Sequence, residues 1–149
     1  GPDQPACFLC DHFKHPQRDA ENHVLRRSDT ALMVLNRFPY SSGHLLIAPA
    51  AHEGQFEALS DTVLLELTCW IRDAKVLLDR TLNAQGYNIG MNVGHCAGAG
   101  LPDHLHWHIV PRWGGDTNFM PVFGDVKVIP EALNRTYEKL HETAHELGW

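Results

Sequence analysis

Three histidines alternate with apolar residues in one short run, His104 to Val110 (HLHWHIV). A period of two is typical of a strand that has imidazoles on one face and buried side chains on the other. In a regular strand, neighbouring histidines lie about 6.6 Å apart and the outer pair about 13 Å apart, too far to share one metal ion. Imidazole titrates near neutral pH and serves in nucleophilic and acid–base chemistry, so the row indicates three assigned roles.

The 149 residues predict one domain whose core needs no disulfide support. The net charge of −6 argues against a nucleic-acid polymer as partner, because no basic stripe can neutralise phosphates. No apolar run is long enough to span a membrane, and no signal-peptide pattern stands at the start. We therefore expect a cytoplasmic protein with no membrane partner.

Hydrophobic periodicity predicts about five strands and two main helices. Ser60 is expected to cap the first helix, and Gly86 to end it. Strands joined by short turns favour a single α+β domain built on an antiparallel sheet. An irregular N-terminal tail over 1–22 is expected to precede a domain over 23–149. The expected strands cover 23–27, 31–35, 44–48, 86–93 and the histidine run, and the expected helices cover 61–84 and 130–147.

The run HLHWHIV matches the signature of the histidine-triad (HIT) family of nucleotide hydrolases and transferases. The resemblance covers about residues 23–135, since LNR at 35–37 and GHLLIAP at 43–49 also resemble the family's first hairpin. The segment PRWGGDTNFMP at 111–121 is similar to one branch, the diadenosine polyphosphate phosphorylases and adenylyltransferases. The resemblance implies a HIT-like fold, a nucleotide substrate and pairing into a homodimer.

The same resemblance implies nucleotidyl transfer at the α-phosphate of a dinucleoside polyphosphate such as diadenosine tetraphosphate. His106 would be the nucleophile that forms a nucleotidyl–histidine intermediate. His108 would orient the phosphate or hold a proton, and His104 would support the site. Phosphate, giving ADP, and water, giving AMP, both stay open as acceptors.

Two alternatives to this reaction stay open. One is a nucleoside phosphoramidate hydrolase that uses the same histidines. The other is a non-enzymatic nucleotide-binding or regulatory module. The intact triad disfavours the second, since binding alone needs no nucleophile.

The resemblance also implies contacts to the nucleoside and to the outer phosphates. Asn36 would contact the ribose hydroxyls. Leu35 and Phe38 would sandwich the base. Arg112 is a candidate for contact with the phosphates farther from the reacting one.

A small-residue loop before the triad resembles the family's phosphate-binding segment. Asn92 would supply an amide there, and close approach of the main chain would supply N–H groups. Many family members carry Gly-Gln or Gln-Ser just before the triad, whereas this chain has GLPD at 100–103. Which group steadies the leaving phosphate therefore stays open. The loop residues implied are Gly98, Ala99 and Gly100.

Cys7 and Cys10 form a CxxC pair, which holds tetrahedral zinc when two more ligands complete it. Some HIT proteins and the related galactose-1-phosphate uridylyltransferases have a structural zinc of this kind. The resemblance implies His52 and His104 as the other two ligands, and a Zn²⁺ that fixes the start of the triad strand. Two free thiols are the alternative. A redox pair is disfavoured, because no helix start is expected after the cysteines.

Overall fold

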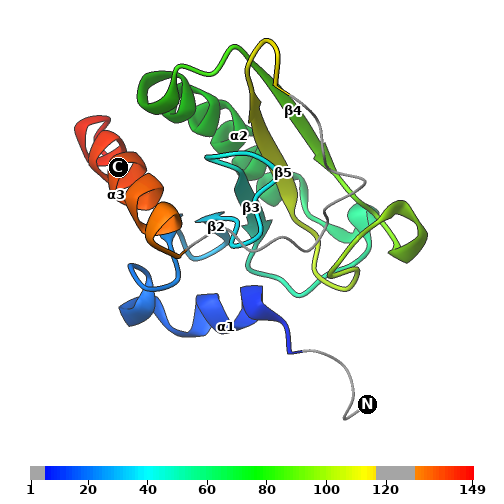
Figure 1. The fold of residues 1–149 in the computed structure, drawn as a ribbon. Coiled ribbons are helices and arrows are strands. Elements are labelled where there is room, and N and C mark those ends of the chain that lie inside the picture. Colours follow the sequence, from blue (N-terminus) through cyan, green and yellow to red (C-terminus); the bar gives the residue numbers. More distant parts are fainter. Residues whose placement is uncertain (1–5, 117–129) are drawn as a thin grey trace.

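The computed structural model describes residues 6–116 and 130–149 (Figure 1). Its strands form one antiparallel sheet in the order β1-β2-β3-β5-β4, which confirms the predicted single α+β domain. The last part of the 111–121 motif, residues 117–121, lies outside the described residues. The strands are β1 (Val24–Arg27), β2 (Ala31–Leu35), β3 (Leu45–Pro49), β4 (Gly86–Met91) and β5 (Trp107–Arg112). The helices are α1 (Phe8–Lys14), α2 (Asp61–Leu82) and α3 (Pro130–Glu146), with short 3₁₀ turns at Pro16–Arg18, Phe56–Ala58 and His95–Ala97.

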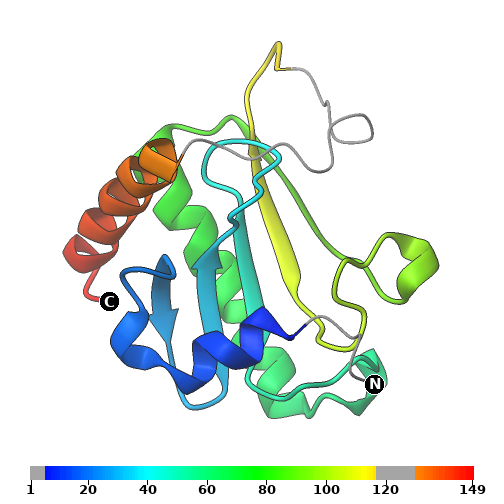
Figure 2. The same cartoon turned by 60° about the horizontal axis from the view of Figure 1, so that its bottom comes forward.

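Alternate residues of β2 point to opposite faces of the sheet and enter two separate apolar clusters. Met33 and Leu35 belong to the larger cluster with α2 and α3. Leu32 and Val34 belong to the smaller one with Leu9 of α1. Figure 2 shows α1 crossing in front of the sheet and α2 behind it. On this face α1 packs against β1, β2 and β3, and no helix within 6–116 and 130–149 packs against β5 and β4 there.

The expectation of an irregular segment over 1–22 is wrong for residues 8–14, which form α1. Cys7 caps this helix, because its Sγ accepts a hydrogen bond from the Cys10 N–H at 3.4 Å. A helix does therefore start at the CxxC pair. Leu9 is fully buried against the sheet. Helices this short depend on such packing more than on their own propensity, which explains why the periodicity did not reveal it.

Helix α2 begins as predicted and ends earlier. Ser60 caps its N-terminus, since its hydroxyl accepts a hydrogen bond from the Val63 N–H at 3.2 Å. Asn83, in the left-handed region at φ 52°, ends the helix. Asn tolerates that conformation, so Gly86 is free to begin β4 instead. None of the helices within 6–116 and 130–149 is long and apolar enough to cross a membrane.

The histidine run is not one regular strand, contrary to prediction. Strand β5 begins at Trp107, and the residues before it leave the ladder. The Leu105 N–H donates to the Glu53 carbonyl at 2.8 Å, which ties this stretch to a loop instead. His104 consequently turns away from the other two histidines, whose ring centroids lie 4.9 Å apart.

Candidate active site

A fourth histidine stands behind the triad and determines how one triad member carries its proton. His44 is fully buried at the start of β3. Its Nδ1 accepts hydrogen bonds from the Tyr40 N–H at 3.2 Å and the Asn36 amide at 3.3 Å. Its proton must therefore be on Nε2, which donates to His108 Nδ1 at 2.9 Å. This donation leaves the proton of neutral His108 on Nε2.

No role was predicted for His44 from the sequence. The available signal was a histidine directly ahead of the apolar strand 45–49. Burial there costs free energy unless each ring nitrogen finds a partner, and His44 has one for each. That pattern distinguishes a positioned histidine from an incidental one.

His106 has the opposite tautomer. Its Nδ1–H donates to the His104 carbonyl at 3.0 Å. The lone pair of a neutral His106 ring is therefore on Nε2, the form required of an imidazole nucleophile. His106 and His108 thus present a nucleophilic nitrogen and an N–H donor side by side.

Burial keeps these rings uncharged at neutral pH. Desolvation, helped by the neighbouring His108 and His106, lowers the pKa of His44 from 6.5 to about 3. Desolvation and the charge of His106 lower the pKa of His108 to about 4. Burial also lowers the pKa of His106, although its bond to the His104 carbonyl opposes this shift. The site therefore holds neutral imidazoles, not imidazolium cations.

Both rings face a cavity of 500 Å³ beside the small-residue loop. Gly98 has φ +91°, a conformation that suits glycine. Its N–H already donates to the His95 carbonyl at 3.0 Å. The N–H groups of Ala99 and Gly100 have no backbone partner within 6–116 and 130–149. The structure brings these predicted site residues together around the cavity: Asn36, Asn92, Gly98, Gly100, His106 and His108.

A second cavity, of 380 Å³, adjoins the first and shares Asn36 and Leu46 with it. Phe38 lines it, as a base contact should. Leu35 borders it, but its side chain packs in the main core under α2. Val34 points to the face of the sheet where Leu46 also lies. Val34 is therefore a better candidate than Leu35 for contact with the base.

Two polar side chains that the sequence did not single out also line this second cavity. His12 and Asn22 are each only 7% exposed. His12 Nδ1 and Asn22 Nδ2 are buried and have no hydrogen-bond partner among the described residues. A buried polar atom without a hydrogen-bond partner costs free energy of folding. These two atoms lie at the edge of a cavity, where a ligand could supply the missing partner.

The predicted metal ligands also come together. The candidate ligand atoms of Cys7, Cys10, His52 and His104 all lie within 4.8 Å of one another. His104 Nδ1 is 3.2 Å from Cys7 Sγ, 3.5 Å from Cys10 Sγ and 3.3 Å from His52 Nδ1. Zn–S bonds of about 2.3 Å and Zn–N bonds of about 2.0 Å give tetrahedral edges of about 3.3 Å between two nitrogens, about 3.5 Å between nitrogen and sulfur, and about 3.8 Å between two sulfurs. The spacing therefore fits one zinc ion.

The protonation state of His104 also fits a bound zinc ion. His104 Nε2–H donates to the Pro49 carbonyl at 2.8 Å, so Nδ1 offers its lone pair to the cluster. Burial, and then the neighbouring Cys7, raise the pKa of Cys10. A bound cation would therefore be needed to hold the Cys10 sulfur as a thiolate. His104 is completely buried and does not line the cavity beside His106.

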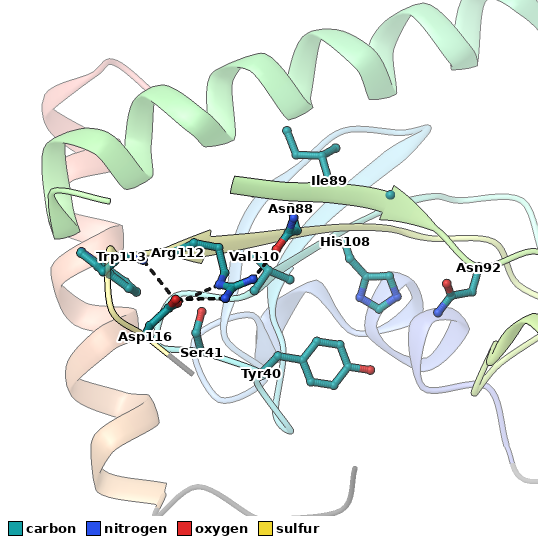
Figure 3. A pocket seen from close by; sticks show the side chains of 11 residues that line it. Tyr40, Ser41, Asn88, Ile89, Asn92, His108, Val110, Arg112, Trp113 and Asp116 are labelled. Carbon is teal, nitrogen blue, oxygen red and sulfur yellow. Dashed lines mark hydrogen bonds and ion pairs between the residues drawn. The ribbon is translucent and has the colours of Figure 1, made fainter. Parts of the chain in front are cut away.

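A third cavity, of 470 Å³, lies over β4 and β5 on the other side of His108 (Figure 3). Arg112 is fixed in it by two hydrogen bonds to Asp116, at 2.7 and 2.9 Å. A further bond of 2.7 Å runs from Arg112 to the Asn88 amide oxygen. Arg112 thus lines the same cavity as His108, four residues farther along β5, but its charge is already paired.

Comparison with known proteins identifies this arrangement. The family model of the HIT domain matches residues 17–115. The chain belongs to the HIT family. The AP-4-A phosphorylase of Mycobacterium tuberculosis strain H37Rv is 40% identical over 118 residues, which are 79% of this HIT chain. The chain spans 60% of that relative's length.

Other HIT proteins extend the comparison. An uncharacterized HIT-like protein of Saccharolobus solfataricus is 32% identical over 117 residues, covering 78% of this chain and 81% of that protein. The crystal structure of a Zn-bound histidine triad family protein from Mycobacterium smegmatis superposes with a TM-score of 0.78. That comparison covers 96% of both chains at 22% identity, which establishes the shared fold.

Proposed function

We propose that this HIT protein transfers a nucleotidyl group from the α-phosphate of a dinucleoside polyphosphate through a covalent bond to His106. The paired tautomers carry the proposal. His106 offers a lone pair on Nε2, and His108 offers an N–H beside it. A binding module would need neither. The similarity to a relative named AP-4-A phosphorylase supports the choice of substrate class.

In the first step, His106 Nε2 attacks the α-phosphorus. The new N–P bond forms as the bond from the α-phosphorus to the bridging oxygen breaks, and the leaving nucleotide departs on that oxygen. His106 Nδ1–H keeps its bond to the His104 carbonyl, which stabilises the charge that develops on the ring. The Nε2–H of His108 donates to the departing oxygen or to a phosphate oxygen.

In the second step, an acceptor oxygen attacks the same phosphorus and the N–P bond breaks, which restores neutral His106. Phosphate as acceptor gives a nucleoside diphosphate, and water gives a nucleoside monophosphate. The name of the mycobacterial relative favours phosphate. His44 acts here as a positioning residue, because its bond holds His108 in the donor tautomer.

The nucleoside would occupy the cavity next to α1. Asn36 would contact the ribose, with its amide oxygen already held by the Phe38 N–H at 3.0 Å. Val34 and Phe38 would contact the base, and Leu35 would support this wall from the core. Phosphate oxygens would lie against Asn92 and the loop of Gly98, Ala99 and Gly100.

The structural metal would be held by Cys7, Cys10, His52 and His104. When bound, Zn²⁺ supplies a cross-link between the start of α1, the loop after β3 and His104. The carbonyl of His104 accepts the hydrogen bond from the His106 ring. The ion would therefore position His106 and take no part in the reaction. Thiolate ligands agree with a reducing compartment, which supports the cytoplasm as location.

A homodimer also belongs to the proposal. Within the described residues, β4 pairs with β5 alone and is an edge strand. Ile89 and Val93 on or beside it are each 47% exposed. An uncovered edge with apolar side chains is a ready pairing surface. Light scattering after size exclusion should give twice the chain mass, and Ile89→Lys should shift it toward the monomer.

The experiment that tests the reaction is product analysis of diadenosine tetraphosphate turnover, with and without inorganic phosphate. ADP and ATP formed only with phosphate identify a phosphorylase. AMP and ATP formed regardless of phosphate identify a hydrolase. Unchanged turnover in His106→Ala would refute the proposed nucleophile. Turnover of adenosine 5′-phosphoramidate alone would favour the phosphoramidate hydrolase.

A further inference from the structure

We infer that the cavity over β4 and β5 binds the distal half of a dinucleotide, that is, the leaving phosphates and the second nucleoside. The inference rests on the proposed function and specifies the substrate for the same site. It begins from the position of His108. This ring lies between two cavities. The cavity over β4 and β5 is lined by a cation, amides and an aromatic side chain.

The two cavities form one continuous path. Tyr40, Asn92 and His108 line both of them. The nucleoside cavity joins the same path at its other end through Asn36 and Leu46. Neighbouring strands lie about 4.8 Å apart, so the path crosses about 14 Å from β2 to β4. A mononucleotide would fill its first part only.

The register of β4 against β5 opens the distal part. His108 faces Gly90 across the ladder, and a Cβ at Gly90 would meet nothing within 4 Å. Val110 faces Asn88 in the same register. This face of both strands is the one that α1 leaves uncovered. The missing side chain opposite His108 therefore gives the leaving phosphates a way out along the sheet.

The cavity changes in character with distance from His108. Figure 3 shows Asn92 and His108 at one end and Arg112 with Trp113 at the other. Arg112 lies four residues along β5, about 13 Å from His108 in an extended strand. Asp116 and Asn88 fix the plane of its guanidinium, so it forms a rigid site for phosphate oxygens.

Trp113 follows β5 at the far end of the cavity, beyond Arg112 (Figure 3), and this end would take the second base. Its indole N–H donates to the Asn83 carbonyl at 3.1 Å, which fixes the ring. A ring held in place loses little entropy when a base stacks on it. Base–aromatic stacking contributes about 1–3 kcal/mol per base. The ion pair of Arg112 with Asp116 limits the positive charge, so stacking and amide contacts would carry most of the distal affinity.

The test compares two substrates of one reaction. Diadenosine tetraphosphate would reach the distal cavity, whereas adenosine 5′-phosphoramidate would not. We expect Trp113→Leu to lower the ratio of the two kcat/KM values, dinucleotide over phosphoramidate, by about 5- to 150-fold. Asn88→Ala should lower the same ratio. The matched control, Phe38→Leu in the nucleoside cavity, should lower both kcat/KM values and leave the ratio within twofold.

Equal losses on both substrates, or no loss on either, would overturn the distal site. Calorimetry with His106→Asn separates this result from failure of the proposed function, because it needs no turnover. Tighter binding of diadenosine tetraphosphate than of AMP, lost when Trp113→Leu is added, would support the site even if the wild type were inactive. Equal affinity for both ligands would overturn it whatever the activity.

Discussion

The buried His44 makes a quantitative prediction about stability against pH. An unfolded chain protonates this histidine near pH 6.5, whereas burial in the fold lowers its pKa to about 3. A group whose pKa is lower in the folded protein than in the unfolded chain contributes its full stabilisation at pH values above the pKa of the unfolded chain. This stabilisation is lost as the pH falls toward the pKa of the folded protein, because only the unfolded chain then binds the proton. At pH 5 the unfolded chain binds the proton and the folded protein does not.

The magnitude follows from the distance to the unfolded pKa. A pH of 5.0 lies about 1.5 units below the unfolded pKa of 6.5. Each of these pH units lowers the free energy of unfolding by about 1.4 kcal/mol, whereas the change from pH 7.5 to 6.5 has little effect. His44 alone should therefore remove about 2 kcal/mol of unfolding free energy. In His44→Gln this loss should be absent, although the variant starts from a lower stability because it loses the ring's three hydrogen bonds.

Urea unfolding at the two pH values, with equal zinc loading, measures the difference directly. The acid-induced loss in the wild type should exceed that in His44→Gln by about 2 kcal/mol. His95→Gln, at an exposed histidine, is the matched control and should behave like the wild type. Equal acid-induced losses in wild type and His44→Gln would refute the claim that the fold holds this ring buried and neutral.

Three further changes test other parts of the structure. Cys10→Ser should lower zinc content below one ion per chain by elemental analysis, and chelators should then lower Tm only in the wild type; one retained ion would contradict the ligand set. Ser60→Ala should cost about 1 kcal/mol in urea unfolding, because α2 loses its cap, and an unchanged midpoint would argue against it. His12→Leu removes an unpartnered buried nitrogen and should hold or raise the unfolding free energy by about 1 kcal/mol, while raising KM for the dinucleotide; a large loss of stability would instead make His12 structural.

The sequence predicted the elements whose signals are local. Strand 31–35 is bounded by turn residues, and its bounds agree with β2. The cap at Ser60 follows from its side chain alone. The four predicted metal ligands also come together, as the resemblance implied, although they are spread over 98 positions from Cys7 to His104.

What the sequence missed depends on contacts between distant segments. The triad leaves its strand because Leu105 bonds to Glu53, which no periodicity could reveal. Helix α1 forms because Leu9 finds a pocket on the sheet. Leu35 and Val34 are both apolar, so only the pairing of β2 decides which of them faces the side of the sheet covered by α1. His44 gained its role from His108, a residue 64 positions away.

The most direct measurement is mass spectrometry of the protein during turnover. Wild type mixed with diadenosine tetraphosphate, without phosphate, is quenched in alkaline denaturant, where a phosphorus–nitrogen bond to histidine survives, and then digested. We predict one adenylyl group on the peptide that contains His106, absent in His106→Asn and lost from the wild type when acceptor is added before the quench. An adenylyl group on another residue, or product formation at full rate in His106→Asn, would contradict transfer through His106.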